Sequence, residues 1–325
     1  MILRSSTAIS HPNIAFIKYW GNADPELRLP SNGSISMNLE GLDTITSISK
    51  NTDDKSKHNL IINGKTQETS RVSTFLDKAG AMYGFHDTLV IESTNNFPMG
   101  AGIASSASAY SALAVALQKF YQLNLSSMEL STLARLGSGS ACRSIPSGYV
   151  EWFQGNNHQT SYSISIASHD HWELFDCILV VNTGKKKIGS TEGHLRADTS
   201  PYQSVRVHDT DRRLEICRRA IINQDFEKFA WIIELDSDMM HAVMMTSNPP
   251  ITYWQPASLA ILQEVRKLRR SGIECAYTMD AGPNVHVICT KDHVKNILDH
   301  FEQFPGIHQL LLAKVGMGAR SIPGQ

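Results

Sequence analysis

The sequence predicts an α+β protein built from two lobes, and three observations support this fold class. The first half shows short strand-like segments joined by turns and followed by helices. The second half opens with long helical patterns and then mixes strands with helices. Residues 184–204, between the halves, have little periodicity and are typical of an ordered loop. We therefore expect an N-terminal lobe at residues 1–185 and a C-terminal lobe at residues 186–325.

Polar–apolar alternation and turn signals locate the strands of the first half. Residues 34–39 alternate, residues 45–49 follow, and residues 60–62 end at the turn signal Asn63-Gly64. The other strand-like segments of this half are residues 88–92, 149–153 and 177–182.

Apolar residues at helical spacing locate the helices. The apolar residues of 71–83 fall on one face, and residues 110–121 are strongly apolar. Ser126 and Glu129 form a capping signal for a helix that runs to Leu136. The second half is predicted to hold helices at 207–223, 226–245, 256–271 and 291–304, and strands at 275–279, 285–289 and 309–315.

The composition excludes several classes of protein. A chain of 325 residues, 42% hydrophobic and 19% charged, is long enough for a substantial core. The formal net charge of -1 gives no indication of a nucleic-acid partner or of a polybasic membrane anchor. There is no long apolar run near residue 1 and none of membrane-spanning length elsewhere. We expect a cytoplasmic protein.

The cysteines and histidines show no metal-ligand spacing. The five cysteines are scattered and odd in number, so we expect buried free thiols rather than a disulfide framework. Four histidines have no visible nucleophile partner, and most of them are expected to be structural or exposed. They are His11, His194, His241 and His286.

A run of small residues between a strand-like and a helix-like segment is the most informative feature of the chain. Residues 98–108 read PMGAGIASSAS, and a helix follows. Small side chains let a backbone wrap closely around a ligand, and the N–H groups of a helix N-terminus favour an anion such as phosphate. On these residues alone, a plain turn is an open alternative. The run lacks the Gly-Lys-Ser/Thr of a Walker A loop and the three-glycine spacing of a dinucleotide fingerprint.

Two further clusters suit anionic ligands. Ser138, Ser140 and Arg143 offer two hydroxyls and a fork of N–H donors, and arginine pairs bidentately with carboxylate or phosphate. A helix-end turn with a surface ion pair is the alternative.

Lys18 lies in the apolar run NIAFIKYWG, where it must snorkel to solvent or face an anion. Asp280 follows strand-like YTM and is either a turn former or a carboxylate pointing into a cleft.

Six segments together resemble the mevalonate diphosphate decarboxylases, within the superfamily of galactokinase and of homoserine, mevalonate and phosphomevalonate kinases. They fall in order across nearly the whole chain: PNIAFIKYWG (12–21), LPSNGSISMNL (29–39), NNFPMGAGIASSASAY (95–110), GSGSACRS (137–144), NPPITY (248–253) and YTMDAGPN (277–284). The resemblance implies a two-lobed small-molecule-kinase fold with a ferredoxin-like C-terminal lobe and an active site in the cleft between the lobes.

The resemblance also implies an activity. Mg-ATP would phosphorylate the C3 hydroxyl of mevalonate 5-diphosphate, and phosphate and carbon dioxide would then leave to give isopentenyl diphosphate. Asp280 would orient or deprotonate the hydroxyl, Lys18 would stabilise charge beside it, and Arg143 would bind the substrate carboxylate. The implied partners are this small molecule and a second copy of the chain, with no nucleic acid and no membrane.

Further residues receive roles from the same resemblance. The substrate-binding residues would be Tyr19, Trp20, Arg71, Ser138, Ser140 and Arg196, beside Arg143. The cofactor-binding residues would be Ser93, Asn96, Gly100, Gly102, Ser105 and Ser106, with Ser106 also near magnesium.

Departures from the usual family pattern leave alternatives open. The departing positions are Gly33, Met99-Gly100, Pro146-Ser147 and the loop from Gly189 to His194 with its acidic Glu192. One alternative is a phosphomevalonate decarboxylase, which uses the monophosphate and therefore needs fewer donors. Another is a mevalonate-type kinase without decarboxylation, although the presence of both Lys18 and Asp280 favours decarboxylation.

Overall fold

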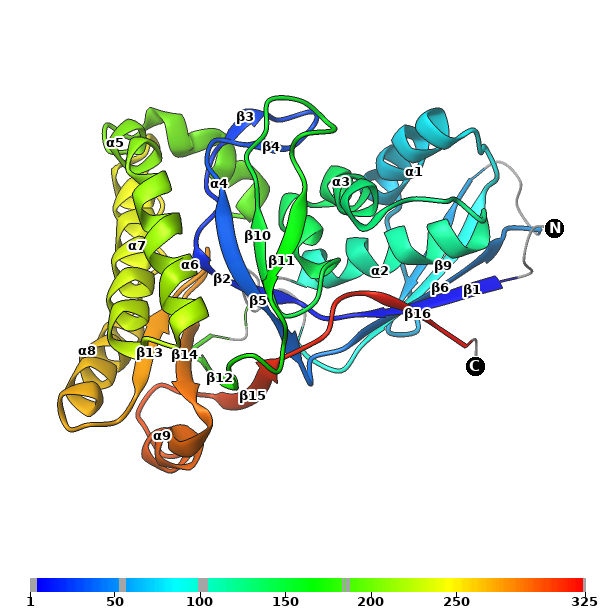
Figure 1. Ribbon diagram of the computed structural model, residues 1–325. Helices are drawn as coiled ribbons and strands as arrows, with labels where there is room; N and C mark the ends of the chain where they lie inside the picture. The colour runs from blue at the N-terminus through cyan, green and yellow to red at the C-terminus, as the bar shows by residue number, and fades with distance from the viewer. Residues whose placement is uncertain (1–4, 53–56, 99–104, 183, 185–187, 324–325) are drawn as a thin grey trace.

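The computed structural model describes residues 5–52, 57–98, 105–182, 184 and 188–323, which form two large β-sheets with helices packed on them and a small sheet of β3 and β4 (Figure 1). The strands are β1 (Ser5–Ser10), β2 (Asn13–Ile17), β3 (Asn22–Asp24), β4 (Leu29–Pro30), β5 (Ser34–Glu40), β6 (Thr44–Lys50), β7 (Asn59–Ile62), β8 (Lys65–Gln67), β9 (Leu89–Asn95), β10 (Tyr149–Trp152), β11 (Ser163–Ala167), β12 (Leu174–Val180), β13 (Cys275–Thr278), β14 (Val285–Thr290), β15 (Gln309–Val315) and β16 (Arg320–Ile322). The helices are α1 (Ser70–Tyr83), α2 (Ser105–Phe120), α3 (Ser127–Gly137), α4 (Ser190–Arg196), α5 (Gln203–His208), α6 (Thr210–Asn223), α7 (Phe226–Thr246), α8 (Pro256–Arg270) and α9 (Val294–Phe301), with 3₁₀ turns η1 (Gly139–Ser144), η2 (Ala197–Thr199) and η3 (Lys291–His293).

The first sheet has the strand order β16-β1-β6-β9-β7-β8 and is covered by α1, α2 and α3. Alternate residues of β6 are buried, as expected for a strand with one covered face. Ala8, Ile48 and Ile91 of the sheet pack with Leu113 and Leu117 of α2 in one apolar cluster. Helix α2 is therefore held firmly against the centre of this sheet.

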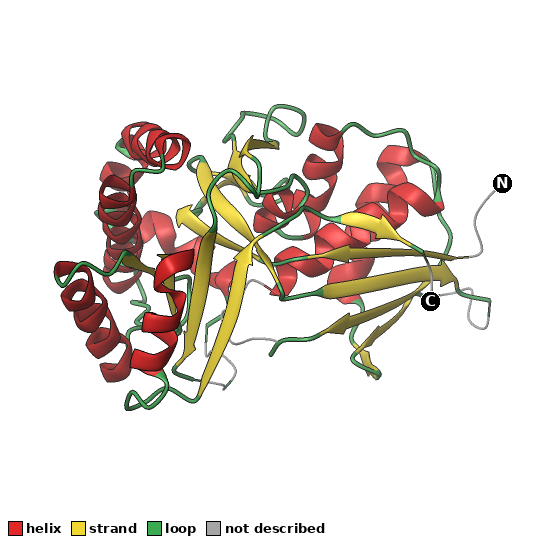
Figure 2. Ribbon diagram, turned by 60° about the horizontal axis from the view of Figure 1, so that its bottom comes forward, coloured by secondary structure: helices red, strands yellow, loops and turns green. Residues whose placement is uncertain are grey.

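The second sheet has the order β11-β10-β5-β15-β12-β14-β13, and β2 also pairs with β5. Its last four strands are antiparallel in the order β15-β12-β14-β13, and α8 and α9 pack on one face of them. Helices α6 and α7 cover the opposite face. Figure 2 shows the resulting two groups of helices, one beside each sheet. This arrangement confirms the predicted α+β class and the ferredoxin-like C-terminal part.

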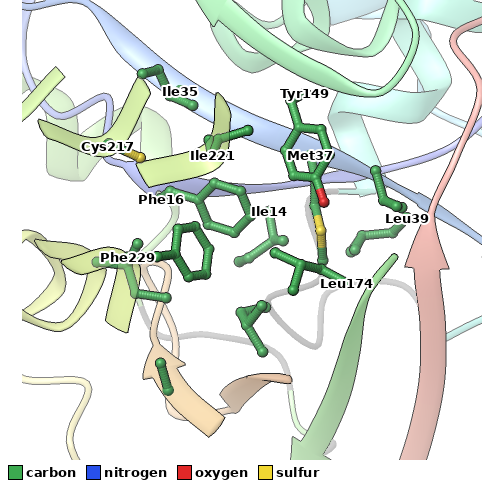
Figure 3. Packing of buried hydrophobic residues seen from close by; sticks show 14 of the residues in the cluster. Ile14, Phe16, Ile35, Met37, Leu39, Tyr149, Leu174, Cys217, Ile221 and Phe229 are labelled. Carbon is green, nitrogen blue, oxygen red and sulfur yellow. The ribbon is translucent and has the colours of Figure 1, made fainter. Parts of the chain in front are cut away.

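The largest apolar cluster lies between the second sheet and helices α6 and α7 (Figure 3). Phe16 of β2 meets Phe229 of α7 edge to face, with ring centroids 4.8 Å apart. All five residues of β2 are buried, and each large apolar side chain that is fully buried contributes about 1.5–3 kcal/mol. Because β2 leads directly into Lys18, this core fixes the position at which Lys18 enters the site.

The predicted loop at residues 184–204 was wrong in part. The described residues of this segment include α4, the turn η2 and the first two residues of α5. A Cβ on Gly193 would collide with the indole of Trp20, so α4 packs directly on that ring. A helix of 7 residues held by such contacts leaves no periodic pattern that sequence reasoning could detect. The remaining predicted helices and strands are present, with ends shifted by a few residues.

The division of the chain at residues 185 and 186 stays a prediction. Strand β12 precedes that point and pairs with β14 and β15, whereas β16 returns from the C-terminal part to pair with β1. The predicted free thiols are confirmed, because all five cysteines are buried and unbridged. Among the helices of the described residues, none combines the length and apolar character that crossing a bilayer requires.

Candidate active site

A cavity of about 320 Å³ brings together residues that are far apart in the sequence. Lys18 follows β2, Arg143 lies on η1, and Asp280 follows β13. The other lining residues are Ala15, Tyr19, Trp20, Arg28, Arg71, Ser105, Ser106, Ser138, Gly139, Ser140, Gly189, Ser190, Thr191, His194, Met240 and Ala281. Most of the residues predicted to bind substrate therefore share one cavity.

Lys18 and Asp280 form an ion pair on the cavity wall. Nζ of Lys18 lies 2.6 Å from Oδ1 of Asp280, and the side chains are 2% and 27% exposed. Of the two possibilities for Lys18, the structure therefore selects the one in which it faces an anion. Asp280 also forms a turn, because the Gly282 N–H donates to its carbonyl at 2.7 Å. Its carboxylate is nevertheless the more exposed partner and is open to a ligand.

Burial and pairing together set the protonation of this pair. Burial lowers the pKa of Lys18, and the attraction of Asp280 opposes this only partly. Burial alone would raise the pKa of Asp280, but Lys18, His286 and Arg143 outweigh it, and the net direction is downward. The carboxyl is therefore ionised at neutral pH, beside a lysine that releases its proton more readily than an exposed one. Such a pair is typical of acid–base sites.

A buried network fixes the backbone of Lys18. Its N–H donates to Oδ1 of Asp236 at 2.7 Å. Its carbonyl accepts from Asn32 at 2.9 Å and from Arg206 at 2.6 Å. Arg206 and Arg213 both pair with Asp236, and these three side chains are at most 1% exposed. Removing one member would leave an uncompensated buried charge, so the network resists rearrangement.

Arg143 is buried rather than part of a surface ion pair, which excludes the alternative raised by the sequence. Its residue is 3% exposed. Nε donates to Asn13 and Ser36 at 3.2 and 3.1 Å, Nη1 donates to Ser34 at 2.7 Å, and Nη2 donates to Asn13 at 3.0 Å. A guanidinium carries five N–H groups, so one on each terminal nitrogen is left for a ligand. A carboxylate fits this bidentate arrangement.

A second buried pair, His286 with Asp176, affects the pKa values of Lys18 and Asp280. Nδ1 of His286 on β14 lies 2.6 Å from Oδ2 of Asp176 on β12, and both side chains are at most 2% exposed. His286 lowers the pKa of Asp280, and Asp176 opposes the lowering of the Lys18 pKa by burial. His286 is thus a structural histidine, as expected for most of the histidines, and it also influences Asp280.

Aromatic rings form another part of the wall. The His194 ring stacks on Tyr19 at 4.1 Å and lies 4.7 Å from the Trp20 ring. The Gly21 N–H donates to Nδ1 of His194 at 3.0 Å. Burial raises the pKa of Tyr19, so its hydroxyl stays protonated, and it donates to Asn22. Helix α4 is therefore held through His194 against Tyr19, Trp20 and Gly21, which follow Lys18.

A second cavity, of about 300 Å³, meets the first at the start of α2. Both cavities are lined by Arg71, Ser105 and Ser106. Ser106 lies within hydrogen-bond distance of Ser138, with the two Oγ atoms 3.2 Å apart. The N–H groups at the start of a helix attract anions. A phosphate chain placed there would lie between the two cavities.

The structure separates the other predicted residues into three groups. Ser93 lines the second cavity. Arg196 is outside both linings; it pairs with Glu192 and donates to the Pro249 carbonyl at 3.3 Å. Asn96 is also outside them, because it accepts the Asp43 N–H at 2.8 Å in a turn, and Asn95 lines the second cavity instead. Gly100 and Gly102 lie outside the described residues.

Sequence reasoning did not assign a functional role to three residues: Arg28, His194 and Asp236. Arg28 lines the cavity from a residue with a positive φ of 52° and donates Nε to the Leu136 carbonyl at 3.0 Å. His194 lies within the segment predicted as a loop, and Asp236 lies within a long apolar helix. None of them has a spacing that signals a site, since each reaches it through tertiary packing.

Comparison with protein families assigns both parts of the chain. Residues 10–163 match the family described as diphosphomevalonate decarboxylase-like N-terminal domain. Residues 177–317 match the mevalonate 5-diphosphate decarboxylase C-terminal domain. The chain is 38% identical to a diphosphomevalonate decarboxylase of Candida albicans, over 93% of this chain and 90% of that protein. It is 36% identical to the Homo sapiens enzyme of that name, over 90% of this chain and 78% of that one.

Solved structures agree with these matches. A mevalonate diphosphate decarboxylase from Staphylococcus aureus is 35% identical, with a TM-score of 0.92 and 99% of each chain covered. One from Enterococcus faecalis is 36% identical, with a TM-score of 0.91 over 98% of this chain and 99% of that one. A third, described as MDDEF in complex with MVAPP, AMPPCP and magnesium, is 37% identical, with a TM-score of 0.92 and the same coverage. This chain belongs to the diphosphomevalonate decarboxylase family.

Proposed function

We propose that this chain catalyses the ATP-dependent decarboxylation of mevalonate 5-diphosphate to isopentenyl diphosphate, with release of ADP, phosphate and carbon dioxide. Relatives along nearly the whole chain carry the name of this activity. The observation that carries the proposal is the Lys18–Asp280 pair in a cavity that meets a second cavity at the start of α2. This geometry supports transfer between two ligands, one in each cavity.

Asp280 is the residue proposed to act on the C3 hydroxyl. Its carboxylate is ionised, faces the cavity and is able to accept the hydroxyl proton as the C3 oxygen attacks the γ-phosphorus of ATP. Lys18, 2.6 Å away, stabilises the negative charge that develops there. The bond between the γ-phosphorus and the ADP oxygen breaks in this step. ATP thereby converts the hydroxyl, a poor leaving group, into a phosphate.

Arg143 is proposed to hold the substrate carboxylate until it departs. Its two remaining N–H groups suit a bidentate contact. In the second step the C3–oxygen bond breaks and releases phosphate. The bond to the carboxylate also breaks, its electron pair forms the new double bond, and carbon dioxide leaves. Orientation of the carboxylate by a buried, fixed arginine favours this concerted loss.

The start of α2 is proposed to bind the ATP phosphates, with the base in the second cavity. Apolar side chains such as Leu60, Ile62 and Ile91 line that cavity and suit a planar base. Within the described residues there is no cluster of three or more His, Cys, Asp or Glu able to hold a metal ion. This fits magnesium, which binds mainly through nucleotide phosphates and needs one or two protein oxygens, such as Ser106. When bound, magnesium neutralises charge on the transferring phosphoryl group.

Rates on two substrates test the proposal. Purified protein with Mg-ATP is given either mevalonate 5-diphosphate or mevalonate 5-phosphate, and the product is identified by mass spectrometry. The proposal expects isopentenyl diphosphate from the first substrate at the higher kcat/KM. A higher kcat/KM on the monophosphate, with isopentenyl phosphate as product, would replace it by the phosphomevalonate decarboxylase alternative.

The remaining expectations are proposals of the same kind. We propose lobes at residues 1–185 and 186–325, a homodimer, and a cytoplasmic location. Proposed roles are also kept for the substrate- and nucleotide-binding residues named from the sequence that line the two cavities. Light scattering coupled to size-exclusion chromatography tests the dimer, because a mass near 36.0 kDa would identify a monomer instead.

A further inference from the structure

We propose that His194 binds the phosphate end of the substrate as an uncharged hydrogen-bond donor through its Nε2–H group. This inference rests on the proposed function and names a contact within the substrate cavity. Three observations carry it: the tautomer of the ring, its fixed position, and the charges around it.

The tautomer follows from one hydrogen bond. A backbone N–H can only donate, and the Gly21 N–H points at Nδ1 of His194 at 3.0 Å. Nδ1 therefore carries no proton, and the single proton of the neutral ring is on Nε2. Burial lowers the pKa of this ring to about 3, and nearby Arg28, Arg206 and Arg143 act in the same direction. His194 is consequently a neutral donor near pH 7.

The ring is held in place, and its donor atom is accessible. His194 stacks on Tyr19 and lies against Trp20, while Gly193 beside it packs on the Trp20 indole. His194 lines the first cavity. Within the described residues Nε2 has no hydrogen-bond partner, yet it is not among the atoms sealed from solvent. A rigid donor that faces a cavity loses little entropy when it binds a ligand.

The surrounding charges identify the chemical class of the ligand group as an anion. Arg28, also on the wall, exerts the strongest effect of any neighbouring charge on the His194 ring. Lys18 with Asp280, and the bidentate face of Arg143, suit the hydroxyl and carboxylate of the substrate. The remaining cations of the wall, Arg28 and Arg71, are then left for the phosphate end, together with His194. Arg196, which the resemblance names as substrate-binding, lines neither cavity and is paired with Glu192 one turn earlier on α4.

Two substitutions separate the role of Nε2–H as a donor to the ligand from the role of Nδ1, which accepts the Gly21 N–H. His194→Asn keeps an oxygen near the position of Nδ1 for the Gly21 N–H but has no donor at the position of Nε2. His194→Gln places an amide N–H near Nε2. Leu195→Asn is the matched control, because it changes the next residue of α4, whose side chain is 61% exposed.

Binding of mevalonate 5-diphosphate and of inorganic diphosphate is measured by calorimetry without nucleotide. A hydrogen bond to a charged group corresponds to roughly a tenfold or greater change in affinity. His194→Asn should therefore raise both dissociation constants by about tenfold or more. The glutamine variant should stay within about threefold of wild type, and the control should not change.

Equal affinity of His194→Asn and wild type for both ligands would overturn the inference. So would an equal loss in the asparagine and glutamine variants, because that result assigns the ring a packing role. Failure of the proposed function is distinguishable, since wild type itself would then not convert mevalonate 5-diphosphate.

Discussion

The two cavities that meet at Arg71, Ser105 and Ser106 differ in how their walls are built. The first is lined by charged groups whose partners lie in several elements: Lys18 pairs with Asp280, and Arg143 donates to residues of β2 and β5. The second is lined mainly by apolar side chains of β7, β9, α1 and α2. Covalent chemistry needs preorganised charges, whereas a flat base needs a surface of suitable shape. The first cavity should therefore be far more sensitive to single substitutions than the second.

The largest expected effect is at Asp280. Asp280→Asn removes the proton acceptor while keeping the shape of the side chain, and kcat should fall by about two to four decades. The dissociation constant for mevalonate 5-diphosphate should change much less, since Arg143 and the rest of the cavity wall remain. Steady-state kinetics and calorimetry give the two numbers.

Asp198→Asn is the matched control for that substitution, because Asp198 is exposed on η2 and lines neither of the two cavities. A loss of less than about tenfold in the Asp280 variant would remove Asp280 from the acid–base role.

The buried network should matter for stability as well as turnover. Among the described residues, Asp236→Ala leaves the buried Arg206 without a carboxylate partner and leaves Arg213 with Asp209 alone, and loss of one partner of a buried pair is worth about 3–5 kcal/mol. Urea denaturation should show a drop of this size in the free energy of unfolding. A variant as stable as wild type would contradict the view that this network fixes Lys18.

The pH profile should report Lys18. Its pKa is below that of an ordinary lysine because of burial, so the charged form is lost as pH rises through a value lower than 10.5. We expect kcat to decline on the alkaline side at lower pH than an exposed lysine would give. In Lys18→Arg this decline should disappear, because arginine stays protonated. An unchanged alkaline decline in that variant would assign it to another group.

The smallest effect is expected in the second cavity. Ile62→Val removes one methylene from its wall, which corresponds to at most about a fourfold rise in KM for ATP. The KM for mevalonate 5-diphosphate and kcat should stay the same. A change in kcat as large as that from Asp280→Asn would abolish the contrast between the cavities.

This contrast also explains what the sequence could predict. Strand alternation and helical spacing predict most elements, and the six family segments predict that Lys18, Arg143 and Asp280 share one site. Those segments are continuous in the sequence. The residues that sequence reasoning missed instead depend on contacts between distant parts of the chain. Asp236 is 218 positions from Lys18, whose N–H it accepts, and His194 is 173 positions from Gly21.

Two predicted site residues lie outside both cavities because of local contacts. Arg196, predicted to bind substrate, pairs with Glu192 one helical turn away on α4. Asn96 was assigned to the nucleotide, but its amide closes a turn with Gly41 and Asp43. Local hydrogen bonds of this kind compete with ligand contacts. No motif shows which of the two prevails.

One measurement tests the central claim, that ligands in the two cavities react together, most directly. Purified protein is incubated with Mg-ATP and mevalonate 5-diphosphate, and ADP and carbon dioxide are quantified in the same sample over time. We predict that the two products form in equal amounts, and that both are lost in Asp280→Asn. ADP formed without carbon dioxide would contradict it and identify a kinase.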